Sequence, residues 1–138
     1  MDLSLVKERL SNSDLAAGAN TDVLAQLLWL ADVLRFEPGA PIFKAGTPAD
    51  GRFLILIDGR CSVEGKGEMY DPSAAGKGIL MGEVGLLNPR HKRTATVIAE
   101  EPCVALSWKL DKLPEAIRSL LEPVFEKTAF ERISSFLP

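Results

Sequence analysis

Apolar residues recur at helical spacing over the first third of the chain. Leu3, Val6 and Leu10 predict a short helix. A second helix is indicated after Gly18 and Asn20, and Thr21 or Asp22 is suited to cap its start. Its apolar face consists of Val23, Leu24, Leu27, Leu28 and Ala31. We therefore expect N-terminal helices within residues 1–35.

From Phe36 onward the pattern changes to short β-like runs separated by turn residues. Residues 53–57 are apolar at every position, which predicts a strand covered on both faces. Asp58-Gly59 follows at once and leads into residues 61–63, a pattern typical of a hairpin. Residues 41–44, 94–98 and 103–108 predict further extended segments. The glycine-rich residues 65–78 predict a long loop.

The last part of the chain returns to helical spacing. Pro114 and Pro123 fit the first turns of two consecutive helices, where a missing N–H has no cost. In the second helix one stripe carries Phe125, Ala129, Ile133 and Phe136. We predict one domain over residues 1–138, with N-terminal helices in 1–35, a β-roll in 36–110 and C-terminal helices in 111–138. The fold class is α+β and mainly β, a small antiparallel β-roll or jelly-roll barrel.

Composition removes several classes of function. The chain is 46% apolar and 25% charged, which is typical of a globular protein, and its net charge of −3 disfavours nucleic acid and anionic lipid as partners. One histidine, His91, is too few for a three-histidine zinc site, so no metal site is expected. Cys61 and Cys103 form no CxxC pair and are interpreted as buried strand residues, and Trp29 and Trp108 as core. Without a leader pattern or a long apolar run, we expect a cytoplasmic protein with no membrane insertion.

One segment is suited to bind an anion. Residues 84–99 contain Arg90, Lys92 and Arg93 and no acid, and they overlap the sequence Gly82-Glu83-Val84-Gly85. Glycines let backbone amides approach a ligand closely, and an arginine fork matches a phosphate. A carboxylate such as that of Glu83 suits a ligand that also presents hydroxyl groups, as a ribose does.

These residues give the chain a resemblance to the cyclic nucleotide-binding domain family. Gly39, Gly46, Asp50 and Gly59 match the glycine and aspartate pattern around the first strands of the family. Residues 82–87, followed by Arg93-Thr94-Ala95-Thr96-Val97, match its phosphate-binding cassette. The resemblance covers about residues 25–138 and implies a β-roll with the cassette at 82–97.

The resemblance also implies roles for single residues. Arg93 would pair with the cyclic phosphate, Glu83 would accept the ribose 2′-hydroxyl, and Thr94 could touch phosphate or a guanine amino group. The expected ligand-binding residues are Gly82, Glu83, Val84, Arg93, Thr94 and Ala95. In the family a C-terminal helix covers the base, and here the candidates are Phe130, Ile133, Ser134 or Phe136.

Two positions depart from the family pattern. Lys92 stands where proline is frequent, and Arg90 could compete with Arg93 for the phosphate. Gly85 stands where alanine is frequent, a small change.

The function expected from the resemblance is sensing of cAMP or cGMP by a regulatory module that is not an enzyme, has no catalytic residues and needs no cofactor. The C-terminal helix would offer a face to a protein partner or to a second copy. One alternative is the same fold without a ligand, serving as a protein interaction domain. A metal-cupin enzyme is a weaker alternative, because the chain has a single histidine.

Overall fold

A computed structural model describes residues 2–87 and 90–134 of the chain. The N-terminal part holds helices α1 (Leu3–Ser11) and α2 (Thr21–Leu30), with the short 3-10 helix η1 (Asp14–Ala17) between them. The strands are β1 (Asp32–Phe36), β2 (Pro41–Phe43), β3 (Arg52–Asp58), β4 (Cys61–Val63), β5 (Met69–Tyr70), β6 (Ile79–Met81), β7 (Val97–Ala99) and β8 (Cys103–Lys109). The remaining helices are α3 (Pro72–Ala75), α4 (Glu83–Leu87), η2 (Leu110–Lys112) and α5 (Glu115–Ser134).

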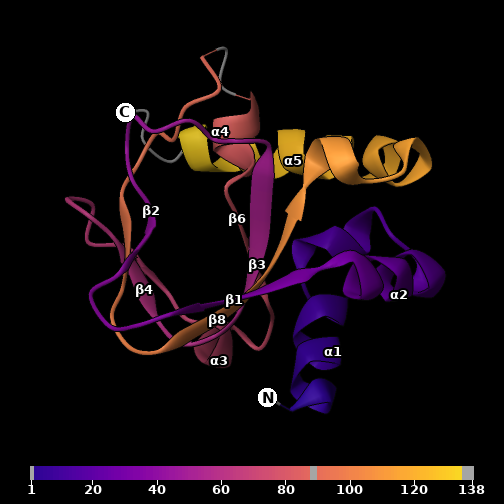
Figure 1. The fold of residues 1–138 in the computed structure, drawn as a ribbon, viewed down its shortest axis with the longest axis horizontal. Helices are drawn as coiled ribbons and strands as arrows, with labels where there is room; N and C mark the ends of the chain where they lie inside the picture. The colour runs from indigo at the N-terminus through magenta and orange to yellow at the C-terminus, as the bar shows by residue number, and fades with distance from the viewer. Residues whose placement is uncertain (1, 88–89, 135–138) are drawn as a thin grey trace.

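The strands form two antiparallel sheets of four strands each. One sheet has the order β1-β8-β3-β6 and the other the order β2-β7-β4-β5. Figure 1 shows the strands curled into a roll, with α1 and α2 beside it and α5 running along its upper end. The predicted fold class, a small antiparallel β-roll with helices at both ends, is confirmed.

Strand β3 lies between two separate apolar cores, as its continuous apolar run predicts. Phe53, Ile55 and Ile57 belong to the core shared with the helices. Leu54 and Leu56 point to the other side, into the core enclosed by the roll. Alternation along a strand sends successive side chains to opposite faces, and here both faces are covered. All five side chains are at most 3% exposed.

The hairpin predicted at Asp58-Gly59 is wrong. Strand β3 pairs with β6 and β8, whereas β4 pairs with β5 and β7, so the chain changes sheets at this turn. Gly59 has φ +90°, and a Cβ there would lie 2.3 Å from the Pro102 carbonyl oxygen. The glycine therefore allows a tight corner between the two sheets, because a side chain would clash there. The hairpin prediction failed because strands that follow each other in sequence need not pair with each other.

Three segment boundaries also differ from the predictions. Strand β1 begins at Asp32, inside the segment predicted to be helical. Residues 65–78 are not one loop, since they contain β5 and the helix α3, which Asp71 caps by accepting hydrogen bonds from two backbone amides. The strand predicted at 94–98 is confined to Val97–Ala99.

The C-terminal part contains one long helix where two were predicted. Helix α5 runs from Glu115 to Ser134 with Pro123 inside it. Leu121 and Phe125, on either side of the proline, are both fully buried, and this packing holds the helix together across the missing N–H. Trp108 is core as predicted, but Trp29 is 90% exposed, so its assignment to the core is wrong.

Candidate functional site

A cavity of about 550 Å³ lies between the roll, α4 and α5. The six residues predicted to bind a ligand all line it: Gly82, Glu83, Val84, Arg93, Thr94 and Ala95. We call it the cassette cavity. The structure thus brings together side chains from α4, from the segment before β7 and from the C-terminal helix, and the rest of the wall is mainly apolar.

Arg93 is held almost entirely inside the protein. Its Nη1 donates to the Gly82 carbonyl at 2.9 Å, and its Nη2 donates to the carbonyls of Ala49 and Arg52, both at 2.8 Å. The guanidinium also lies over the ring of Phe43, with its central carbon 4.1 Å from the ring centre. The residue is only 7% exposed. These contacts fix the guanidinium in the wall of the cassette cavity.

The charge of Arg93 persists despite this burial. Loss of solvation lowers the pKa of its guanidinium to about 10, while the nearby carboxylates of Asp50 and Glu83 act in the opposite direction. The group is therefore a cation at neutral pH. Three of its five N–H bonds are directed at carbonyls, so within the described part of the chain the Nε–H and one Nη1–H are not used. These two donors lie on different edges of the guanidinium, so either one of them, on a fixed cation, can donate to a phosphate oxygen.

The glycines of the cassette make room for Arg93. Gly82 has φ +91°, and a Cβ there would lie 2.9 Å from Arg93 Nη1 and 3.0 Å from Phe43 Cζ. A Cβ on Gly85 would lie 3.1 Å from the same Nη1. The alanine that is frequent at the second position would therefore crowd the arginine in this chain. At both glycines of the Gly-x-x-Gly pattern, an added Cβ would therefore press against the buried Arg93 side chain.

Glu83, the first residue of α4, is completely buried. Both of its carboxylate oxygens are held by α5: Thr128 Oγ1 donates to Oε2 at 2.8 Å, and Arg132 Nη1 donates to Oε1. Burial raises the pKa of Glu83, and the charge of Arg132 and the hydroxyl of Thr128 oppose that rise. The carboxylate is thus the point where the cassette and the C-terminal helix are joined.

Arg132 makes further contacts around the cassette cavity. Its Nη2 donates to the Leu80 carbonyl, and its guanidinium carbon lies 5.5 Å from the centre of the Tyr70 ring. Tyr70 and Arg132 line the same end of the cavity. This arrangement places a cation and an aromatic ring where the helix closes over the cassette.

The basic residues before Arg93 lie elsewhere. Arg90, His91 and Lys92 are exposed and do not line the cassette cavity. His91 adopts a left-handed backbone with φ +51°. Arg93, rather than Arg90, therefore supplies the guanidinium of the cavity.

The candidates for covering a base have different positions. Ile133 lines the cassette cavity while 52% exposed, whereas Phe130 is 71% exposed and does not line it. Phe136 and the side chain of Ser134 lie outside the described part of the protein. Ile133 is the candidate that the geometry favours.

Sequence reasoning missed the partners of the two charged residues. Thr128 and Arg132 are four residues apart on α5 and share one face, and Phe43 comes from β2. The signal available in the sequence was general: a buried carboxylate needs a donor, and helix α5 carries a hydroxyl and a cation one turn apart near its end.

In residues 2–87 and 90–134, no group of three or more histidine, cysteine, aspartate or glutamate side chains is placed to hold a metal ion. None of the helices in those ranges combines the length and apolar character needed to cross a membrane.

Comparison with known proteins identifies the fold. The PKAR CBD2 domain bound to Sp-2Cl-cAMPS has a TM-score of 0.77 and 19% identity, over 95% of this chain and 86% of that one. A putative cyclic nucleotide-binding protein from Geobacter metallireducens has a TM-score of 0.70 and 18% identity, over 92% and 97% of the two chains.

A regulatory subunit of a cAMP-independent protein kinase A from Trypanosoma brucei has a TM-score of 0.72 and 22% identity, over 98% of this chain and 52% of that one. No curated protein matches the chain. The family model of the cyclic nucleotide-binding domain matches residues 33–119, which include the whole cassette and all of both sheets except Asp32. The chain belongs to the cyclic nucleotide-binding domain family.

Proposed function

We propose that the chain is a regulatory module that binds cAMP or cGMP in the cassette cavity and is not itself an enzyme. The observation that carries the proposal is that Glu83 and Arg93, ten positions apart in sequence, line one cavity and come from one cassette. A cyclic nucleotide presents an anionic phosphate and a ribose hydroxyl on neighbouring atoms. A fixed guanidinium and a carboxylate complement those two groups.

In this proposal Arg93 neutralises the cyclic phosphate with its charge and donates one of its unused N–H bonds to it. Glu83 accepts the ribose 2′-hydroxyl, and the apolar wall receives the base. Thr94, which is exposed at the rim, is placed to contact the phosphate or a guanine amino group. Val84 and Ala95 contribute backbone and small side chains that let the ligand approach. The cytoplasmic location expected from the sequence stays a prediction.

Ligand binding would be linked to the position of α5 through Glu83. The carboxylate has no exposed surface, because Thr128 and Arg132 cover it. A hydroxyl donor can reach it only if Arg132 gives up or shares an oxygen. Nucleotide binding therefore shifts the population of α5 positions by the difference in affinity between them. The exposed Phe130 on this helix would then meet a partner protein or a second copy.

A second function is favoured by one specific observation. Arg93 and Glu83 already have protein partners, three carbonyls for the first and two side chains of α5 for the second. A domain whose site is closed by its own groups could serve protein interaction without a ligand.

Isothermal titration with cAMP, cGMP and 5′-AMP separates the two functions. We expect saturable binding of a cyclic nucleotide, and loss of about 2–5 kcal/mol of binding free energy in Arg93→Gln, because a buried phosphate then lacks its counter-charge. Arg90→Gln, an exposed arginine of the same segment, is the matched control. A flat titration of the folded wild-type chain with both cyclic nucleotides would contradict the first function and support the second.

A further inference from the structure

A second hollow of about 360 Å³ shares Phe43 and Arg93 as lining residues with the cassette cavity. It lies beside β1 and β2, which are edge strands of different sheets and pair with β8 and β7 rather than with each other. Its apolar wall comes from these strands and from β3: Leu34, Phe36, Ile42, Phe43 and Leu54. We call it the edge hollow. Its volume falls within the range of about 300–1,000 Å³ that is common for small-molecule sites.

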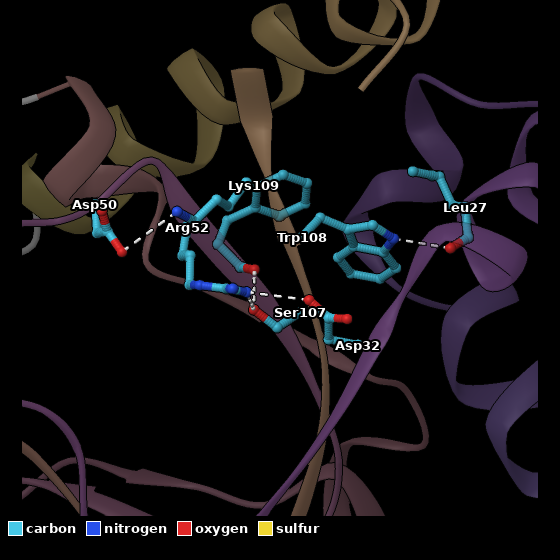
Figure 2. Close-up of polar contacts among 8 residues, drawn as sticks. Leu27, Asp32, Asp50, Arg52, Ser107, Trp108 and Lys109 are labelled. Atoms are coloured by element: carbon cyan, nitrogen blue, oxygen red, sulfur yellow. Dashed lines mark hydrogen bonds and ion pairs between the residues drawn. The ribbon is translucent and has the colours of Figure 1, made fainter. Parts of the chain in front are cut away.

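The inner face of the sheet becomes polar at one end of the edge hollow. Strand register places Asp32 opposite Ser107 and Arg52 opposite Lys109, on the face that also carries Leu54. Figure 2 shows the Arg52 guanidinium beside the Ser107 hydroxyl and the Asp32 carboxylate. Arg52 Nη1 donates to Ser107 Oγ at 3.2 Å and lies 3.4 Å from Asp32 Oδ2. Ser107 is only 1% exposed, so this polar end is built into the sheet.

Arg52 keeps one edge of its guanidinium unused. Both of its side-chain contacts within the described residues are made by Nη1, which leaves the N–H bonds of Nε and Nη2 without an acceptor there. These two nitrogens point parallel donors to one side, the arrangement that binds both oxygens of a carboxylate. The side chain of Arg52 is 35% exposed, so this edge is accessible from solution.

The charges around the edge hollow favour an anion. Lys44, Arg52 and Arg93 line it, and the nearby acids are Asp50, which also lines it, and Asp32, which forms an ion pair with Arg52. Asp50 lies 3.6 Å from Lys109 Nζ, so its charge is already compensated (Figure 2). Lys44 is exposed and has no ion pair with any described residue. An anion with an apolar body complements both the charge and the lining.

We propose that the edge hollow binds a small organic monocarboxylate with an apolar tail. The carboxylate pairs side-on with the Nε and Nη2 edge of Arg52, and the tail lies against Leu34, Ile42 and Phe43. The site is separate from the cassette cavity, with which it shares only Phe43 and Arg93 as lining residues. The proposal does not depend on nucleotide binding.

Titration with sodium octanoate, followed by two-dimensional amide NMR of the whole chain, tests the site. Octanoate should shift amides of β1, β2 and the 44–52 segment in a saturable way, and 1-octanol should bind more weakly because it lacks the charge. Arg52→Gln should weaken octanoate binding by about tenfold to a hundredfold, as expected for a charged hydrogen-bonded pair. Arg60→Gln, an arginine that is also ion-paired and half exposed but lies outside the hollow, should leave it unchanged.

A second variant, Ile42→Trp, tests the site independently in case Arg52→Gln does not fold. Ile42→Trp fills the edge hollow from β2 without changing any charge, and it should abolish octanoate binding while the thermal melt stays cooperative. The proposal is overturned if octanoate causes no saturable shift, if Arg52→Gln and Arg60→Gln bind it equally, or if the shifts centre on Gly85 and Thr94 of the cassette cavity or on the exposed Trp29. Failure of cAMP to bind would leave these outcomes unaffected.

Discussion

Replacing Arg132 by methionine tests the connection between α5 and the cassette. The change removes the only ion pair of Glu83 found in the described structure and keeps an apolar stem of similar length. Glu83 is completely buried, so its carboxylate cannot exchange the lost partner for water without local rearrangement. Breaking a buried pair by removing one partner costs about 3–5 kcal/mol of folding stability.

The loss of stability cannot exceed the free energy needed to protonate Glu83, and that free energy depends on pH. An ordinary glutamate pKa of about 4.3 and 1.36 kcal/mol per pH unit give about 4 kcal/mol for protonating Glu83 at pH 7 and about 1 kcal/mol at pH 5. In the variant the pKa of Glu83 is raised in the folded state, so the folded state binds more protons than the unfolded state. The free energy of unfolding therefore falls as pH rises through the interval between the two pKa values. Arg132→Met should lose about 3–4 kcal/mol at pH 7 and much less at pH 5.

Urea unfolding monitored by tryptophan fluorescence at the two pH values measures the effect. The double variant Glu83→Gln with Arg132→Met should recover stability at pH 7 relative to Arg132→Met alone, because a neutral amide replaces the stranded charge. Lys127→Met, an exposed position on the same helix, is the control for the substitution itself. The reasoning fails if Arg132→Met loses the same free energy at pH 5 and pH 7, or if the double variant is no more stable than the single one.

Three further changes test single contacts. Gly82→Ala should lower the free energy of unfolding by about 1–3 kcal/mol more than Gly39→Ala, because both glycines have positive φ but only the Cβ at Gly82 meets other atoms; thermal melts of the pair decide it. Thr128→Val should cost about 1–2 kcal/mol and Thr128→Ser little, and equal losses in urea unfolding would contradict a role for the hydroxyl. Trp108→Phe removes the 2.8 Å hydrogen bond that Nε1 donates to the Leu27 carbonyl and leaves that buried carbonyl unsatisfied. It should lower the free energy of unfolding by about 1–3 kcal/mol, and a near-neutral change would contradict the role of this hydrogen bond.

The sequence predicted the buried strand well because its signal is local. Five consecutive apolar residues at 53–57, rich in β-formers and followed by a turn signal, favour a strand covered on both faces, and both cores are present. The turn after it was misjudged because Asp-Gly suits a hairpin and a corner equally. Only the long-range pairing of β3 with β8, and of β4 with β7, distinguishes the two.

The helices also show that local sequence cannot predict features that depend on tertiary packing. Pro123 resembles a helix start in sequence, but buried residues on both sides keep α5 continuous. Trp29 has the size and apolar character of a core residue, yet its position on α2 leaves it 90% exposed. Tertiary packing determines both the continuity of α5 and the exposure of Trp29, and neither can be predicted from the neighbouring residues alone.

For the candidate site, the resemblance to the family was enough to predict one half. Glu83 and Arg93 belong to a short continuous motif, so their proximity follows from the cassette itself. Thr128 and Arg132 lie 45 and 49 positions after Glu83, and no periodicity in α5 indicates that they reach α4. Their contact with Glu83 depends on how the helix docks.

The position of β3 between two cores has a consequence for unfolding. Its outward side chains complete the packing of the helices and its inward side chains complete the interior of the roll, so neither body can come apart while the other stays intact. The backbone amides of β3 should accordingly exchange with deuterium only through opening of the entire domain, at a rate set by its overall stability. Removal of residues 2–30 would uncover Phe53, Ile55 and Trp108 together and leave a shell of strands prone to associate with itself.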